Sequence, residues 1–195
     1  MTKKKIRIGI DVDGVLRDFD SKVLEIIKRL YPDKEVPEFS TDWDFKGVDV
    51  PIKELSKIWQ ETHCEEIYRE ALLMPNVKEE FKLLKEWCRA QRPGYQFAVA
   101  TAQMPYNACH THYWLGKHYF NFLEVYVSNH KHKLDLDILV DDSPKNYDKW
   151  VEAGREEKDY ILFDRPYNQD CPATNRIYKL SDLIELLKNK KSDIY

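Results

Sequence analysis

The sequence predicts an α/β protein built on one parallel β-sheet that is buried on both faces. Short apolar runs alternate along the chain with segments of helical periodicity, as expected when helices connect parallel strands. The apolar runs are nearly continuous instead of alternating with polar residues, which indicates strands that are covered on both sides. A chain of 195 residues is long enough for one sizeable core and a small inserted subdomain.

The predicted strands are short and are separated by polar or helical segments. They cover Ile6–Val12, Tyr95–Ala100, Phe122–Val127, Asp137–Val140 and Tyr160–Phe163.

Helical spacing of apolar residues marks most of the connecting segments. It covers residues 21–30, 52–59, 77–87 and 183–187, and a mixed helical stretch covers 106–118. After the strand "DILV", Ser143 and Pro144 predict a helix with serine as the N-cap and proline in the first turn.

Between Asp18 and about Pro75 the alternation of strands and helices breaks. Residues 31–50 have no periodicity and are rich in proline, aspartate and aromatic residues, whereas Pro51 suits the first position of a helix. We therefore expect a helical insertion at residues 18–74 and a core formed by residues 1–17 and 75–195. The aromatic residues of the insertion could form its own small core or line a pocket; they are Phe19, Phe39, Trp43, Phe45, Trp59 and Tyr68.

Composition excludes several classes of protein. The net charge of −3 provides no global basic field for nucleic acid or an anionic membrane. No apolar run approaches the roughly 20 residues of a membrane span, and Arg7 and Asp11 interrupt the first run, unlike in a signal peptide. The four cysteines form no CxxC pair and are expected as free thiols. These features predict a cytoplasmic protein.

Polar side chains follow the ends of several predicted strands. They are Asp11 and Asp13, Thr101, Asp141 and Asp142, and Asp164. Because ligands bind at the carboxyl ends of parallel strands, we expect these groups to converge at one edge of the sheet. Asp11 and Asp13 alone would fit a metal site, two carboxylates with divided roles, or an ordinary acidic turn. The expected convergence of Asp11 and Asp13 with the polar residues at the other strand ends argues against an ordinary acidic turn.

Carboxylates gathered at one point repel one another unless a cation is bound there, and hard oxygen ligands suit Mg²⁺. One carboxylate could attack phosphorus while another holds the proton needed by the leaving oxygen. The Thr101 hydroxyl and the ammonium of Lys131 or Lys133 could bind the phosphate oxygens. The sequence has no GxxxxGK[ST], GxGxxG or GxSxG motif, so other phosphate-binding and nucleophilic devices are not indicated.

The motif "DVDGV" (Asp11–Val15), the strand-end Thr101, a lysine and "LVDD" (Leu139–Asp142) occur in the order that resembles the haloacid dehalogenase (HAD) phosphatase superfamily. The resemblance runs through the whole chain. It implies a three-layer Rossmann-like parallel sheet, the HAD-like core, with a small helical cap inserted after the first strand.

The resemblance also implies roles for the aspartates. Asp11 would be the nucleophile and Asp13 the general acid and base. Mg²⁺ would be bound by the Asp11 carboxylate, the Asp13 backbone carbonyl and the Asp141-Asp142 pair, with Asp142 as the direct ligand of that pair.

Four stretches are more specifically similar to the 5'(3')-deoxyribonucleotidases: "DVDGVLRDF", "SKIWQE" (Ser56–Glu61), "DILVDDSPKN" and "LFDRPYN" (Leu162–Asn168). In that family, aromatic residues at the cap hold the base of the nucleotide. Phe19 and Trp59 match such aromatics, and Trp43 with Phe45 falls where the family has a further pair.

The same resemblance addresses the phosphate site. It places Lys131, and not Lys133, at the position of the family's phosphate lysine. Ala102 stands after Thr101 where the family often has serine, so one hydroxyl is missing and the backbone N–H of Ala102 remains as a donor.

These observations predict a Mg²⁺-dependent phosphomonoesterase that hydrolyses deoxynucleoside 5'-monophosphates through an aspartyl-phosphate intermediate, and the family suggests uracil and thymine nucleotides. The rival substrates are a sugar phosphate and a nucleic-acid 3'-phosphate, although the mixed charge of the cap argues against a polynucleotide. A non-catalytic nucleotide-binding protein is a second alternative, against which the presence of Asp11, Asp13 and a lysine argues. The expected partner is a small nucleotide, with no membrane and no stable nucleic-acid partner, and a homodimer is left open.

Overall fold

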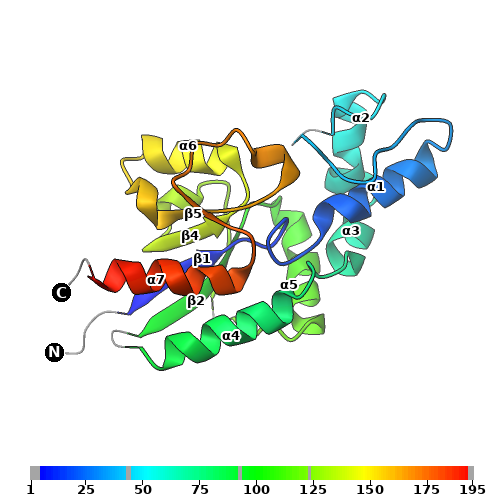
Figure 1. Cartoon of the computed structure of the whole chain (residues 1–195). Helices are drawn as coiled ribbons and strands as arrows, with labels where there is room; N and C mark the ends of the chain where they lie inside the picture. Colours follow the sequence, from blue (N-terminus) through cyan, green and yellow to red (C-terminus); the bar gives the residue numbers. More distant parts are fainter. Residues whose placement is uncertain (1–4, 43–44, 92–93, 123, 193–195) are drawn as a thin grey trace.

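The centre of the molecule is a six-stranded parallel sheet with the strand order β3-β2-β1-β4-β5-β6 (Figure 1). The computed structural model describes residues 5–42, 45–91, 94–122 and 124–192. The strands are β1 (Ile6–Ile10), β2 (Tyr95–Thr101), β3 (Val125–Val127), β4 (Ile138–Asp141), β5 (Tyr160–Phe163) and β6 (Asn175–Ile177).

Strand β1 lies in the middle of the sheet, between β2 and β4. Its Ile10 pairs with Val99 on one side and Val140 on the other. The next residue, Asp11, donates its backbone N–H to the carbonyl of Val140 at 2.9 Å. This register brings the ends of β1, β2 and β4 to the same edge of the sheet.

Helices cover both faces of the sheet, which gives the three layers seen in Figure 1. Helices α4 (Val77–Arg89), α5 (Ala108–Lys117) and α7 (Leu183–Ser192) pack on one face, and α6 (Pro144–Glu152) packs on the other. Both layers contain a fully buried tryptophan whose indole N–H donates to a carbonyl: Trp114 to Ala71 and Trp150 to Glu156. The predicted fold class is confirmed.

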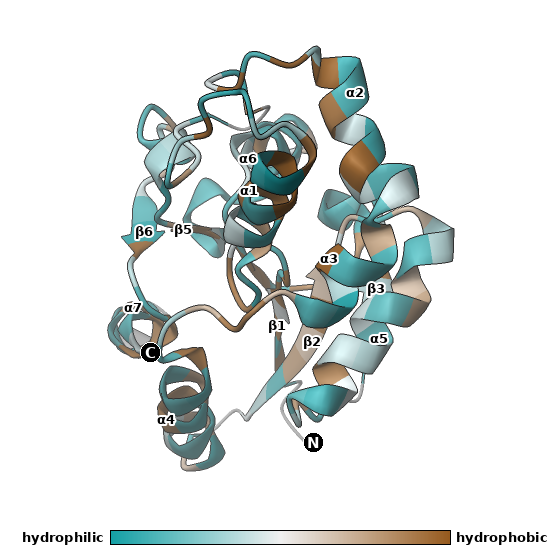
Figure 2. Ribbon diagram, turned by 90° about the vertical axis from the view of Figure 1, so that its right-hand side faces the viewer, coloured by the Kyte–Doolittle hydropathy of each residue, from teal (hydrophilic) through white to brown (hydrophobic). Residues whose placement is uncertain are grey.

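The cap consists of α1 (Phe19–Leu30), α2 (Ile52–Lys57), a π-helical turn (Ile58–Thr62) and α3 (Cys64–Glu70). It lies beyond one end of the sheet, and Figure 2 shows that α2 and α3 each have an apolar and a polar side. The cap has its own apolar cluster of buried residues: Val23, Leu24, Ile26, Ile27, Phe45, Val48, Leu55, Ile58, Ile67 and Tyr68. The exact division into residues 18–74 and the remainder stays a prediction.

Two connections join the cap to the core, and they run side by side. The backbone N–H of Asp18 donates to the carbonyl of Leu72, and the N–H of Met74 donates to the carbonyl of Leu16, both at 2.9 Å. The chain therefore leaves the core next to the point where it returns.

Several element boundaries differ from those predicted. Strand β1 ends at Ile10 instead of Val12, because the chain turns there and the Val12 carbonyl accepts N–H groups of the following loop. Pro51 precedes α2 instead of occupying its first position. Phe122 lies before β3 and stacks on Phe81, with ring centroids 5.2 Å apart.

Other expectations are confirmed. Ser143 caps α6 by accepting the N–H of Asn146 at 3.3 Å. The four cysteines, all of which lie within the described residues, form no disulfide. Strand β6 was not predicted because it contains a single apolar residue, Ile177, and lies at the edge of the sheet.

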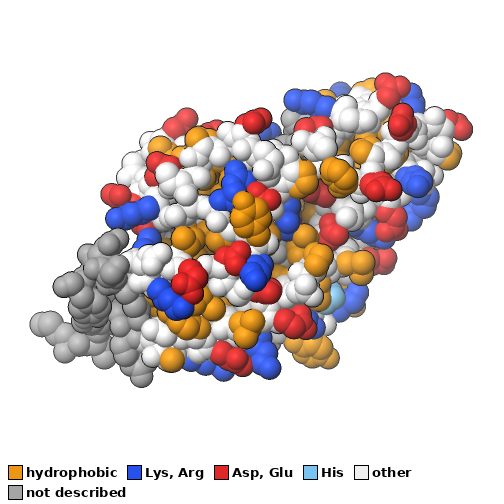
Figure 3. All heavy atoms as spheres, viewed as in Figure 1, with side chains coloured by type: hydrophobic (Ala, Val, Ile, Leu, Met, Phe, Trp, Pro, Cys, Tyr) orange, Lys and Arg blue, Asp and Glu red, His pale blue; other side chains and the backbone are white. Residues whose placement is uncertain are grey.

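The distribution of charged side chains on the surface and the lengths of the helices agree with what the composition predicts. Acidic and basic side chains are interspersed over the face of the molecule seen in Figure 3. No helix in the part of the chain that the structure describes has the length and apolarity needed to cross a membrane.

The two leucines at the middle of α4 provide a test of the layer packing. Leu84 is fully buried against the sheet, whereas Leu83 is 52% exposed. We expect Leu84→Ala to lower the free energy of unfolding by about 2–5 kcal/mol, because it removes buried methyl groups and leaves a cavity. Leu83→Ala, the matched control, should change it by less than about 0.5 kcal/mol in urea denaturation. Equal effects of the two substitutions would contradict the described packing.

Candidate active site

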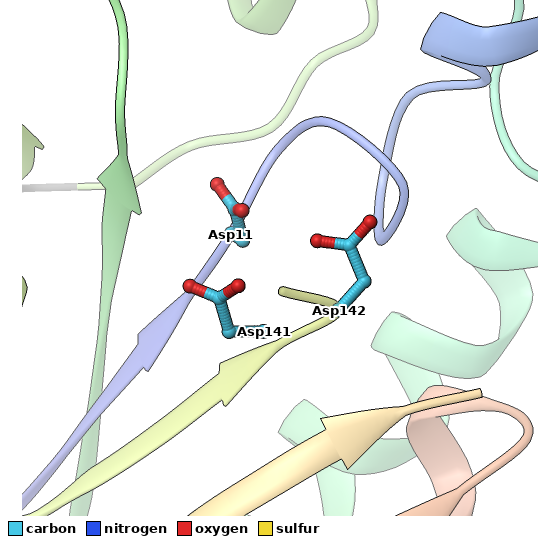
Figure 4. A group of neighbouring side chains, drawn as sticks. All are labelled: Asp11, Asp141 and Asp142. Atoms are coloured by element: carbon cyan, nitrogen blue, oxygen red, sulfur yellow. The ribbon is translucent and has the colours of Figure 1, made fainter. Parts of the chain in front are cut away.

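Three carboxylates converge where β1 and β4 end. One oxygen from each of Asp11, Asp141 and Asp142 lies within 4.8 Å of the others, and the side chains point toward a common space in Figure 4. All three residues are buried, with 6%, 0% and 2% exposure respectively. The pairing of β1 with β4 produces this arrangement, since it sets the two strand ends next to each other.

Lys131 lies among these carboxylates. Its Nζ is 2.7 Å from Asp11 Oδ2 and 2.6 Å from Asp141 Oδ2, and the residue is 2% exposed. Burial alone would lower the pKa of Lys131, but the Asp11 and Asp141 charges outweigh it and raise the pKa above its usual value. Lys133, at the end of the same 3-10 turn, is exposed. The structure therefore brings Lys131, and not Lys133, to the strand ends.

Asp141 has its oxygens occupied by protein donors. Besides Lys131, it accepts the backbone N–H of Ser143 at 2.9 Å and the Asn146 side-chain amide at 3.1 Å. Asn146 thus braces Asp141 from the first turn of α6.

Asp142 differs from Asp141 in having one unsatisfied oxygen. Its Oδ2 accepts the hydroxyl of Tyr167, but its buried Oδ1 has no hydrogen-bond partner among the residues that the structure describes. Buried polar atoms are nearly always paired, so an unpaired carboxylate oxygen in this position fits a bound cation or ligand. Of the two aspartates, Asp142 is the one whose geometry leaves room for a metal.

The pKa shifts agree with an acidic cluster that needs a cation. Burial raises the pKa of Asp11 to about 7, against the opposing effect of Lys131. Burial also raises the pKa of Asp142 well above its usual range, and the charges of Asp11 and Asp141 add to this. A divalent cation would reverse both shifts, since it favours the charged carboxylates. The buried oxygen donors therefore fit a hard divalent ion.

Asp13 points to a different set of partners. Its Oδ1 is 2.7 Å from Nε of Arg17, and its Oδ2 accepts the Gln103 side-chain amide at 3.0 Å. The Asp13 side chain is 25% exposed, so it remains reachable from the cleft. The two aspartates of the first motif are thus held by different contacts.

Thr101 and Ala102 stand at the end of β2, on the other side of β1. The Thr101 hydroxyl oxygen is buried and has no partner within the described part of the chain. Ala102 is exposed at the same cleft. An unpaired hydroxyl beside a lysine suits the oxygen of a bound phosphate.

A cleft of about 820 Å³, open solvent included, extends from these groups to the cap. The wall of the cleft on the cap side is aromatic. The ring centroids of Phe19 and Trp59 are 6.4 Å apart, and those of Phe45 and Trp59 are 5.6 Å apart. Tyr68 lines the same wall at 5.8 Å from Phe19. Trp43 lies outside the described residues. The structure thus places Phe19, Phe45 and Trp59 in the cleft, in addition to the cap's apolar cluster.

Several residues of this region were not predicted from the sequence. The sequence left Tyr68 between the cap core and a pocket, and it assigned no role to Asp20, Asp42 or Tyr167, which also line the cleft. Burial raises the pKa of Asp20 to about 7, and the Asp18 charge adds to it. Tyr167 lies within the stretch "LFDRPYN" and Asp20 follows "DVDGVLRDF", but neither stretch singled out these residues.

Arg165 and Asn168, which follow β5, brace the loops around the carboxylates. The Asn168 amide donates to the carbonyls of Asp142 and Phe163, both at 2.8 Å. Arg165 Nε donates to the carbonyl of Gly14 at 2.6 Å.

Structural comparisons find the same fold in haloacid dehalogenase-like proteins of low sequence identity. A conserved haloacid dehalogenase-like protein, ATU0790 from Agrobacterium tumefaciens str. C58, aligns with a TM-score of 0.60 at 14% identity, over 96% of this chain and 100% of that chain. The Bacillus subtilis "putative HAD-hydrolase YfnB", solved with bound magnesium, aligns with a TM-score of 0.57 at 14% identity, over 95% and 99%.

Sequence comparisons find nucleotidases. "Putative nucleotidase YqfW" from Bacillus subtilis (strain 168) is 23% identical over 189 residues, which is 94% of this chain and 92% of that protein. "Putative 5'(3')-deoxyribonucleotidase" from Chlorobaculum tepidum is 24% identical over 156 residues, 75% of this chain and 74% of that protein.

A match to a family model, together with the shared fold, places the chain among the phosphatases of the haloacid dehalogenase superfamily. The model of one family, "5' nucleotidase, deoxy (Pyrimidine), cytosolic type C protein", matches residues 4–192, and the chain belongs to this family. It is an enzyme, a 5'(3')-deoxyribonucleotidase-like phosphatase, as the first motif and the strand ends predicted.

Gly14 provides a test of how closely the first loop approaches Asp142. Gly14 has φ +74°, and a Cβ there would lie 1.9 Å from Asp142 Oδ2. We expect Gly14→Ala to reduce kcat for phosphate release by at least about 100-fold, because it displaces the carboxylate. Gly154→Ala is the matched control, since Gly154 has φ +73° and nothing within 4 Å of the added methyl. Similar activities of the two variants would show that the close approach is unimportant.

Proposed function

We propose that the enzyme hydrolyses deoxynucleoside 5'-monophosphates, with uracil or thymine as base, in a Mg²⁺-dependent reaction that passes through an aspartyl phosphate. One observation carries the proposal. Asp11 lies beside Lys131 and the unpaired oxygen of Asp142, at the floor of a cleft whose opposite wall is aromatic. A nucleotide has the matching chemistry at its two ends, a phosphate and a flat base.

Phosphate binding would use the donors at the strand ends. Lys131 has three N–H donors, and the described contacts to Asp11 and Asp141 occupy two of them. The third, the Thr101 hydroxyl and the Ala102 N–H could hold phosphoryl oxygens. Asp11, the Asp13 backbone carbonyl and Asp142, with Asp141 beside them, would hold Mg²⁺. When bound, the ion offsets the repulsion between the anionic substrate and the attacking carboxylate.

The chemical steps would fall to the first two aspartates. An Asp11 oxygen attacks phosphorus, so that an O–P bond forms to Asp11 and the bond from phosphorus to the sugar oxygen breaks. Asp13 gives its proton to that leaving oxygen. Asp13 then takes a proton from a water that attacks the aspartyl phosphate, which releases inorganic phosphate and restores the Asp11 carboxylate.

The aromatic wall of the cap favours a nucleoside, with its flat base, over other leaving groups. Stacking on Phe19, Phe45 and Trp59 tolerates any base, because every base has a π face. Asp20 and Asp42 also line the cleft, and their acidic side chains disfavour the polyanionic backbone of a nucleic acid. The pyrimidine named in the family's description supports uracil and thymine.

A phosphate-release screen over deoxy- and ribonucleoside monophosphates, sugar phosphates and 3'-phosphorylated oligonucleotides tests the proposal. We expect dUMP and dTMP to be the best substrates, with activity lost in EDTA and restored by Mg²⁺. Asp11→Asn should reduce turnover at least about 10³-fold, because it removes the nucleophile.

The matched control for that variant is Asp148→Asn, an exposed aspartate on α6, which should retain activity. Near-normal turnover by Asp11→Asn would contradict the assignment of Asp11 as the nucleophile. A preference for sugar phosphates would contradict the proposed nucleotide substrate.

Trp59 tests the aromatic wall. Loss of one stacking partner costs about 1–3 kcal/mol, so Trp59→Ala should raise KM for dUMP by about 5- to 150-fold. KM for 2-deoxyribose 5-phosphate, which has no aromatic ring to stack, should change less than about 3-fold if the effect comes from stacking alone. Phe39→Ala, a 60% exposed aromatic of the cap, is the control and should change neither value. Equal changes for both substrates would remove Trp59 from the base site.

A further inference from the structure

Arg17 is fully buried between the first motif and the cap. Its three nitrogens have three different acceptors: Nε donates to Asp13 Oδ1 and Nη1 to the Tyr68 carbonyl, both at 2.7 Å, and Nη2 to the Thr111 hydroxyl at 3.1 Å. The guanidinium lies between two aromatic rings, 5.0 Å from the centroid of Tyr68 and 5.2 Å from that of Trp114. A buried charge is costly unless it is paired, and Asp13 supplies the opposite charge.

A role of Arg17 in anchoring the cap to the core would explain only one of its three hydrogen bonds. The contact with the Tyr68 carbonyl joins Arg17 to α3, but the remaining contacts lead back to Asp13 by a second route. Thr111 donates its hydroxyl to Gln103 Oε1 at 2.8 Å, and Gln103 donates its amide N–H to Asp13 Oδ2 at 3.0 Å. Arg17, Thr111, Gln103 and Asp13 thus form a closed ring of hydrogen bonds.

The ring fixes the direction of each donor. Arg17 can only donate, so the Thr111 oxygen accepts from it and gives its own proton to Gln103. The Gln103 amide is therefore oriented with its NH₂ group toward Asp13. Both Asp13 oxygens are held, one by Arg17 and one by Gln103, so the carboxylate cannot rotate without breaking a bond.

We infer that Arg17 is a positioning residue that, with Gln103 and Thr111, fixes the Asp13 carboxylate for proton transfer to the leaving oxygen. The inference rests on the proposed function of Asp13. Each carboxylate oxygen has two acceptor positions, so the ring leaves room for the proton that Asp13 gives up.

The test compares leaving groups that differ in their need for a proton. p-Nitrophenolate leaves readily without protonation, whereas phenolate is a poorer leaving group and depends more on a general acid. We measure kcat/KM for p-nitrophenyl phosphate and phenyl phosphate, because this parameter reports steps up to the first bond cleavage. In Arg17→Met we expect at least a ~10-fold loss for phenyl phosphate and less than a ~3-fold loss for p-nitrophenyl phosphate.

Further variants distinguish positioning from a folding defect. Thr111→Val keeps the side-chain shape and removes only the hydroxyl, so it should show the same split between substrates with the fold intact by circular dichroism. Arg69→Met is the matched control, since Arg69 lies over the Tyr113 ring and belongs to no contact with Asp13 that the structure describes. In an Asp13→Asn background, adding Arg17→Met should cost less than ~3-fold more, because the two act on one step.

Equal losses for both substrates, or no loss in either ring variant, would overturn the positioning role. Absence of phosphate release by the wild-type enzyme with Mg²⁺ would instead overturn the proposed function, and the inference with it.

Discussion

Two aspartates share one lysine ammonium at the centre of this structure, and the rest of the active edge depends on that pairing. Lys131 balances Asp11 and Asp141 at 2.7 and 2.6 Å, which allows two carboxylates to be buried where the strands end. The same contact commits Asp141 to the protein and leaves Asp142 with an unpaired oxygen. The edge therefore has three buried carboxylates and one lysine ammonium among them, and this excess of negative charge fits both a divalent ion and a phosphate chemistry that uses it.

The cap completes the site from the opposite side. Phe19 and Trp59 form its aromatic wall, while Arg17 sits beneath it and reaches the Tyr68 carbonyl as well as Asp13. Phe19, which would contact a base, and Arg17, which would position the general acid, are consequently only two residues apart in the chain. Binding of the base and proton transfer by Asp13 would therefore depend on some of the same contacts, such as those of Arg17 with Asp13 and with the Tyr68 carbonyl.

The fold and the positions of the strand-end residues could be predicted because they follow from local patterns. Apolar runs mark strands, and residues at the ends of neighbouring parallel strands must meet, which brings Asp11, Asp141 and Asp142 together. The ring of hydrogen bonds around Arg17 could not be predicted, because Gln103 is 90 residues from Asp13 and Thr111 is 94 residues from Arg17, and no local pattern brings such distant side chains together. The short strand β6 gave no signal for a related reason, since edge strands need few apolar residues.

The two paired connections between cap and core have a consequence for how such enzymes diversify. Backbone atoms make the bonds between Asp18 and Leu72 and between Leu16 and Met74, so they impose little restriction on the side chains there. The cap also has an apolar cluster separate from those that hold the sheet. Evolution can therefore exchange cap sequences, and with them the leaving groups that are accepted, while the catalytic edge is inherited unchanged.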